Sequence, residues 1–178
     1  MNRLDRIYFI TLITCTILVI YQFKTFTTGK PLRDLETRKC ATKMIQNALE
    51  DKRFYQEVIR FFGINGFPTI KIKYMISNLL PCVNSNPMFL NNNSKEAVGY
   101  VMPRYSSKYI FINGDYWYSM SLYEKAETLI HECTHLVLNT EDHAYDHDVS
   151  FLKLDSKKAL KNADTIKQII VELSDNKC

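Results

Sequence analysis

Two of the four histidines in this chain have the spacing of metal ligands on a helix. They belong to His131-Glu132-Cys133-Thr134-His135, which has the pattern His-Glu-x-x-His. Histidines at positions i and i+4 of a helix point the same way, about one turn apart, so both imidazoles can bind one Zn²⁺. The glutamate beside the first histidine can then accept the proton of a water molecule that attacks a peptide carbonyl. The alternative interpretation is two histidines and a glutamate on a solvated helix face.

The residues before the motif predict the helix that it needs. Ser121-Leu122-Tyr123-Glu124 matches a capping box, in which serine and glutamate bind free backbone N–H groups at a helix start. Apolar residues then recur at helical spacing, offset from the three motif residues that carry the chemistry. This stripe consists of Leu122, Ala126, Leu129, Ile130, Cys133, Leu136 and Val137. We expect the stripe to pack against a core.

Composition limits what else the chain can be. Its 178 residues are the size of one domain, and 46% hydrophobic with 24% charged residues is typical of a folded globular protein. The net charge is +4 without a run of five like charges, so we expect no nucleic-acid partner. The five glycines form neither a Walker loop nor a Gly-x-Gly-x-x-Gly turn, which argues against a nucleotide-binding enzyme.

An apolar segment near the N-terminus predicts export from the cytosol. Residues 7–23 carry no charge and follow a short basic head. A helix of this length spans about 25 Å, slightly less than a hydrocarbon core of about 30 Å. A cleaved signal peptide and an uncleaved anchor both fit, and the weak cleavage chemistry favours the anchor over the peptide. We expect residues 1–23 to be the anchor or signal, 24–32 a linker, and 33–178 one extracytoplasmic domain.

Hydrophobic periodicity predicts a mainly helical α+β domain of the zincin-like kind, with a small antiparallel hairpin or sheet. Helical patterns occur in two further stretches, residues 33–62 with a break near Glu50–Lys52, and residues 157–173. Alternating patterns predict three strands, Thr69–Met75 at a sheet edge, Tyr100–Met102 and Tyr109–Ile112. Residues 81–95 are rich in Asn, Pro and Ser and predict a loop.

A catalytic zinc site needs a third protein ligand besides two histidines. In the metzincin pattern a glycine and a histidine follow the second histidine by three and six residues, but this chain has Leu138 and Glu141 there. A gluzincin would use a glutamate from a later helix, and Glu172 is the sole glutamate after Glu141. The remaining possibility is a ligand in residues 139–146, directly after the motif.

This segment resembles the signature of the deuterolysin-type aspzincins, zinc endopeptidases that include the peptidyl-Lys metalloendopeptidases. In that family Gly-Thr-x-Asp-x-x-Tyr-Gly follows the histidine motif, with the Asp as third zinc ligand and the Tyr as a stabiliser of the transition state. Thr140, Asp142 and Tyr145 match. The resemblance therefore implies that Asp142 completes the zinc site and that Tyr145 contacts the developing oxyanion. Asn139 and Asp146 replace the two glycines, and both residue types tolerate a positive φ, so we expect the turn to survive.

The resemblance extends over residues 35–173 and bears on specificity. Lysine-specific relatives recognise the substrate lysine with the Asp of an Asn-Ala-Asp motif and a Glu three residues later. Asn162-Ala163-Asp164 matches the motif, which implies that Asp164 binds substrate, but Lys167 replaces the Glu. Because a like charge repels a substrate lysine, we expect strict lysine specificity to be lost. A helix-capping or first-turn carboxylate is the alternative role for Asp164.

The expected function is hydrolysis of peptide or protein substrates outside the cytosol by a zinc metalloendopeptidase. One Zn²⁺ would be held by His131, His135 and Asp142, with Glu132 as general base. A non-catalytic zinc-binding or adhesion domain of the same fold is the alternative. A membrane partner is expected only through an uncleaved N-terminal segment.

The remaining cysteines and histidines leave several possibilities open. Outside the apolar segment the cysteines are Cys40, Cys82, Cys133 and Cys178, and four cysteines allow three pairings. We expect Cys133 to pack or to form a disulfide, since the zinc site is complete without it. His143 and His147 are expected to be exposed loop residues, with a second metal as the alternative.

Overall fold

The computed structural model describes residues 29–63, 68–91, 97–102, 106–175 and 177–178. The chain divides into two compact units, residues 1–30 and 31–178, and nearly all described residues belong to the second. The anchor or signal predicted over residues 7–23 lies outside the described residues. Among the helices that are described, none is long and apolar enough to cross a membrane.

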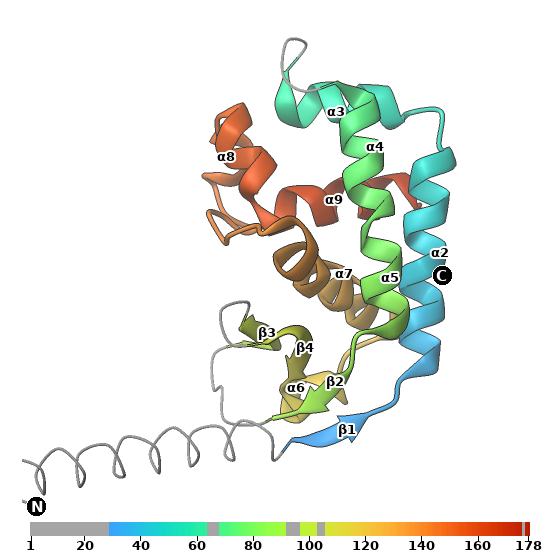
Figure 1. Cartoon of the computed structure of the whole chain (residues 1–178). Helices are drawn as coiled ribbons and strands as arrows, with labels where there is room; N and C mark the ends of the chain where they lie inside the picture. Colours follow the sequence, from blue (N-terminus) through green and yellow to red (C-terminus); the bar gives the residue numbers. More distant parts are fainter. Residues whose placement is uncertain (1–28, 64–67, 92–96, 103–105, 176) are drawn as a thin grey trace, which may run out of the picture. The chain divides into compact units, whose positions relative to one another are not determined.

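Helices make up most of the second unit (Figure 1). They are α2 (Leu35–Glu50), α3 (Phe54–Phe62), α4 (Thr69–Ser77), α5 (Leu79–Ser85), α6 (Gly114–Trp117), α7 (Leu122–Leu138), α8 (Ser156–Lys161) and α9 (Ala163–Leu173), with a 3₁₀ turn at Phe151–Lys153. The predicted break after Glu50 is confirmed. The helix predicted over residues 157–173 is divided, because Asn162 has an extended backbone between α8 and α9.

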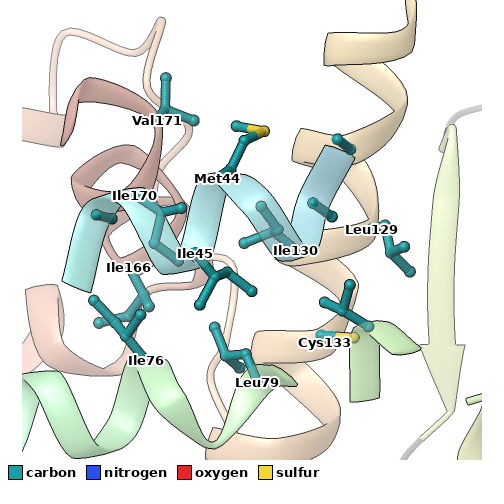
Figure 2. Close-up of a cluster of buried hydrophobic side chains, with 14 of the residues drawn as sticks. Met44, Ile45, Ile76, Leu79, Leu129, Ile130, Cys133, Ile166, Ile170 and Val171 are labelled. Atoms are coloured by element: carbon teal, nitrogen blue, oxygen red, sulfur yellow. The ribbon is translucent and has the colours of Figure 1, made fainter. Parts of the chain in front are cut away.

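The core lies where α2 packs against α5, α7 and α9. Figure 2 shows Ile45 of α2 among apolar side chains that belong to α4, α5, α7 and α9. The labelled members of this cluster are Met44, Ile45, Ile76, Leu79, Leu129, Ile130, Cys133, Ile166, Ile170 and Val171. Full burial of one such side chain contributes about 1.5–3 kcal/mol. The cluster therefore fixes α7 and α9, the two helices that carry the predicted site residues, against each other.

Two disulfides add to this core. Cys40 pairs with Cys178, and Cys82 pairs with Cys133. The first joins α2 to the C-terminal end of the chain, and the second joins α5 to α7. Bridges of this kind typically contribute about 2–4 kcal/mol each. The expectation that Cys133 packs or pairs is confirmed, and it does both.

A four-stranded sheet lies at the opposite end of this unit from α3 and α4 (Figure 1). Its strands are β1 (Lys30–Leu32), β2 (Met88–Leu90), β3 (Gly99–Met102) and β4 (Ser106–Ile112), in the order β1-β2-β4-β3. The predicted strand pair is confirmed as β3 and β4, which are antiparallel. The expectation of a purely antiparallel sheet is wrong, because β2 pairs with β4 in parallel. A mainly helical α+β fold is confirmed.

Two predicted elements in the first half of the domain are wrong. The segment Thr69–Met75 lies in α4 and not in an edge strand. Ile72 of this segment and Ile76 just after it lie one helical turn apart, and both are fully buried, whereas Ile70 is 77% exposed. Seven residues of alternation could not separate the two periods. Of the loop predicted over residues 81–95, the described part (81–91) instead contains the end of α5 and all of β2, and residues 92–95 lie outside the described residues.

The helix that carries the histidine motif is confirmed as α7. The Ser121 hydroxyl accepts a hydrogen bond from the backbone N–H of Glu124, and the Glu124 carboxylate accepts one from the N–H of Ser121. Most of the predicted apolar stripe is buried, although Leu122 and Val137 at its margins are each 39% exposed. Tight packing of this stripe sets the direction of the opposite face, which carries the motif.

Candidate metal centre

Three predicted ligands lie together in the structure. The Nε2 atoms of His131 and His135 are 3.1 Å apart. Asp142 Oδ1 lies 3.2 Å from the first Nε2 and 3.3 Å from the second. Among the described residues, these three form the one cluster of histidine, cysteine and carboxylate side chains close enough to hold a metal ion. Glu172, the ligand of the gluzincin alternative, instead pairs with Arg60.

The turn after α7 brings Asp142 back to the two histidines. Asn139 ends α7 with a φ of 53°, in the left-handed region that a glycine would adopt most easily. The expectation that asparagine replaces the first signature glycine without loss of the turn is therefore confirmed. Asp146 does not adopt a positive φ, so the second replacement needs no such tolerance.

Hydrogen bonds at the Nδ1 atoms orient both imidazoles. His135 Nδ1 donates to the backbone carbonyl of Thr140 at 2.9 Å, and His131 Nδ1 lies 2.7 Å from Asp164 Oδ1. Because a carbonyl and a carboxylate accept hydrogen bonds, each Nδ1 carries a proton, so that in its neutral form each imidazole has the free electron pair on Nε2. This is the arrangement that a neutral histidine needs in order to bind a metal.

The donor set fits a zinc ion. A tetrahedral Zn²⁺ with bonds of about 2.0–2.1 Å holds its ligand atoms about 3.3 Å apart, which is close to the three separations in the cluster. Hydrogen bonds from the two imidazoles hold the pKa of Asp142 well below its ordinary value. Burial alone would lower the pKa of His131, but hydrogen bonds to Asp142 and Asp164 raise it to about 9. The cluster thus attracts positive charge, as a cation site must.

Glu132 lies beside the cluster with an unsatisfied carboxylate. Its side chain is buried, and Oε2 has no hydrogen-bond partner among the described residues. Burial raises the pKa of Glu132 to about 7. An unpaired buried carboxylate costs free energy of folding, so its retention is typical of a functional group that awaits a partner.

The ligands and Glu132 line one cavity of about 870 Å³. Its walls come from α7, from β3 and the two residues before it, from the loop of residues 140–147, and from α9. Tyr145 also lines the cavity, and its ring stacks on that of His131 with the centroids 6.3 Å apart. The predicted catalytic and metal-binding side chains therefore share one space that is large enough for part of a peptide.

Gly99 of β3 lies so close to Glu132 that a side chain at position 99 would displace the Glu132 carboxylate. A Cβ atom on Gly99 would lie 2.9 Å from Glu132 Oε1 and 3.2 Å from Thr128 Cγ2. We therefore expect Gly99→Ala to retain the metal but to lower kcat about 10²-fold, because a shift of about 1 Å in a reacting group can cost that much. Steady-state kinetics with zinc analysis would measure both, with Val101→Ala on the same strand as control. Unchanged kcat in Gly99→Ala would show that Glu132 needs no fixed position.

Asp164 lines the cavity beside the cluster, but its carboxylate is almost completely buried. It is 2% exposed, and its Oδ2 accepts a hydrogen bond from the backbone N–H of Asp146. With Oδ1 facing His131, both oxygens have partners inside the protein. The predicted substrate contact would thus have to compete with these bonds.

Asn162 has a structural role at the site that the sequence analysis did not predict. It is fully buried, and its Oδ1 accepts hydrogen bonds from the backbone N–H groups of His143 and Ala144. Its Nδ2 donates to the Ala144 carbonyl. The side chain therefore fixes the loop that follows Asp142. The Asn-Ala-Asp resemblance marked this position but did not indicate what it does.

The other two histidines stand outside the cluster. His143 Nε2 lies 3.6 Å from a Glu141 carboxylate oxygen, and His147 Nδ1 lies 3.4 Å from Asp146 Oδ1. Neither residue belongs to a group of metal-binding side chains among the residues that the structure describes. His147 is exposed, and its ring stacks on that of Tyr145.

Part of the sequence matches the model of a known protein family. Residues 69–168 match the aspzincin family model, described as lysine-specific metallo-endopeptidase. The chain belongs to this family. It is accordingly a zinc metalloendopeptidase. Its His-His-Asp cluster is a possible binding site for the zinc ion on which the family depends.

The solved structure of a zinc peptidase has a similar fold. The zinc peptidase from Grifola frondosa superposes with a TM-score of 0.57 and 18% sequence identity, over 76% of this chain and 90% of that chain. No curated protein matches the sequence.

Proposed function

We propose that this aspzincin hydrolyses peptide bonds with one Zn²⁺ held by His131, His135 and Asp142. The observation that carries the proposal is the triangle of their ligand atoms, whose edges measure 3.1, 3.2 and 3.3 Å. When bound, zinc supplies Lewis-acid chemistry, polarising a carbonyl and making water more acidic.

Glu132 is the proposed general base and, later, the proton donor to the leaving amine. A base works best when its pKa lies near the working pH, and burial raises the pKa of Glu132 to about 7. Its unpaired Oε2 is available to accept a proton from water. The proton then moves from Glu132 to the amine nitrogen when the peptide bond breaks.

Tyr145 is proposed to donate a hydrogen bond to the oxyanion that develops on the carbonyl oxygen. Burial, followed by the nearby carboxylate of Asp142, raises the pKa of Tyr145 above its ordinary value. The phenol therefore keeps its proton at neutral pH and remains a donor.

The edge strand β3 lines the same cavity, and an edge strand can hold an extended peptide by backbone hydrogen bonds.

Strict specificity for lysine is proposed to be lost in this chain. Asp164 is buried with both oxygens bonded, and the ammonium group of Lys167 lies 3.2 Å from Oδ1. A substrate lysine would have to displace that ammonium group in order to reach the carboxylate. Selective cleavage before lysine in a mixed peptide library would contradict this part of the proposal.

The peptidase domain is also proposed to work outside the cytosol, with membrane attachment through residues 7–23 if they are not cleaved. Two disulfides support this location, because such bridges persist mainly in oxidising compartments. Cell fractionation that finds the oxidised chain only in the cytosol would contradict it.

The test of the proposed function uses the full chain after oxidative folding. We expect one zinc per chain by metal analysis, cleavage of a mixed peptide library, loss of cleavage with a zinc chelator and recovery on adding zinc. Zinc without cleavage would favour a non-catalytic zinc-binding domain. Absence of zinc would contradict the ligand assignment.

A further inference from the structure

A buried lysine stands next to the metal cluster without touching its ligands. The Lys167 side chain, on α9, is 11% exposed. Its Nζ lies 2.9 Å from Asp146 Oδ2 and 3.2 Å from Asp164 Oδ1. Burial would lower the pKa of Lys167, but the two carboxylates raise it above its ordinary value. The residue is therefore a buried ammonium group with two charged partners, which is costly to maintain without a role.

The contacts of Lys167 close a ring. The backbone N–H of Asp146 donates to Asp164 Oδ2 at 2.8 Å, so each of the three residues contacts the other two. Asp146 belongs to the loop that carries Asp142, whereas the other two members belong to α9. The ring thus joins the ligand loop to the helix.

The ring also reaches the first histidine ligand. Asp164 Oδ1, which contacts Lys167, lies 2.7 Å from His131 Nδ1. Without the ammonium group, the carboxylates of Asp146 and Asp164 would face each other with like charge in a partly buried site. Repulsion would then move the loop away from α9 and disturb the acceptor of His131.

We propose that Lys167 is a positioning residue of the metal centre. It holds Asp164 against His131 and holds the loop that contains Asp142 against α9. This inference rests on the proposed function in one respect, namely that the cluster binds zinc. Recognition of an acidic substrate side chain is the competing role, since Lys167 lines the cavity, but two carboxylates already neutralise its charge.

The test compares Lys167→Met with Lys167→Arg in the full chain. We expect Lys167→Met to weaken zinc binding about tenfold, at the lower end of the 10–100-fold range for partners of metal ligands. Competition with a chelator measures this affinity. In the zinc-free protein, the backbone N–H of Asp146 should exchange with solvent faster than in the wild type. Lys167→Arg keeps the charge and should retain most of the affinity and protection.

The control is Lys39→Met, which removes a lysine from the exposed pair with Glu36 and should change neither measurement. Asp146→Ala removes the side-chain partner of Lys167 on the more exposed side of the ring and carries the test if Lys167→Met does not fold. Wild-type zinc affinity and loop exchange in Lys167→Met or Asp146→Ala would overturn the proposal. Equal losses in Lys167→Arg and Lys167→Met would do the same.

Both measurements are independent of catalysis. If the wild-type chain binds zinc but cleaves no peptide, zinc affinity and amide exchange still report on Lys167. If it binds no zinc, the rate of amide exchange at Asp146 in the metal-free wild type and in Lys167→Met still shows whether Lys167 holds the loop. Failure of the proposed function and failure of this inference are therefore distinguishable.

Discussion

Replacement of Glu132 by glutamine is expected to remove peptide hydrolysis while the metal stays bound. Glutamine has nearly the same shape, so it keeps the close contact with Gly99, but it cannot take a proton from water. General-base catalysis contributes about 10²–10⁴-fold to rate, so kcat should fall by at least about 10²-fold. The thermal stability should not fall, because Glu132 is buried and its Oε2 has no partner among the described residues.

The measurement combines kcat on a peptide substrate, zinc content and melting temperature of the same preparation. Glu127→Gln is the matched control, since Glu127 lies on the same helix and lines the same cavity but is outside the metal cluster. It should keep both zinc and kcat. Near-normal hydrolysis by Glu132→Gln would show that another group removes the proton from water.

Those parts of the site that depend on local signals could be predicted from the sequence. The capping box at Ser121 sets where α7 begins, and 3.6-residue periodicity then places His131 and His135 on one face. Asn139 ends the helix with a left-handed conformation that few other residue types tolerate. These signals act within one or two helical turns, so they can be interpreted from the sequence without knowledge of the tertiary structure.

Long-range packing explains what the sequence did not indicate. The pattern over Thr69–Met75 fits two periods, and only the buried environment of Ile72 and Ile76 selects the helix. The parallel pairing of β2 with β4 likewise depends on contacts across about twenty residues of chain. The loop anchor at Asn162 and the ring around Lys167 join segments far apart in sequence, and neither residue type is diagnostic of such a role by itself.

Asp142→Ala is expected to lose the metal and all zinc-dependent hydrolysis. In the described part of the chain, its Oδ1 is the one carboxylate oxygen that lies near both Nε2 atoms, at 3.2 and 3.3 Å. Without it, two imidazoles remain, and a catalytic zinc site needs three protein ligands. The fold should persist, because Asp142 is a surface-accessible loop residue and Asn162 still fixes the following backbone. Metal analysis after dialysis and circular dichroism would measure the two outcomes.

Glu141→Ala is the matched control, since Glu141 is the neighbouring carboxylate and its side chain is 70% exposed. It should keep one zinc per chain. Stoichiometric zinc in Asp142→Ala would require another ligand, and Glu172 is the candidate from sequence. The structure makes that substitute costly: Glu172 binds Arg60 and accepts a hydrogen bond from Gln168, so it would have to abandon both partners. A double variant, Asp142→Ala with Glu172→Ala, that lost the retained zinc would identify that route and overturn the assignment of Asp142.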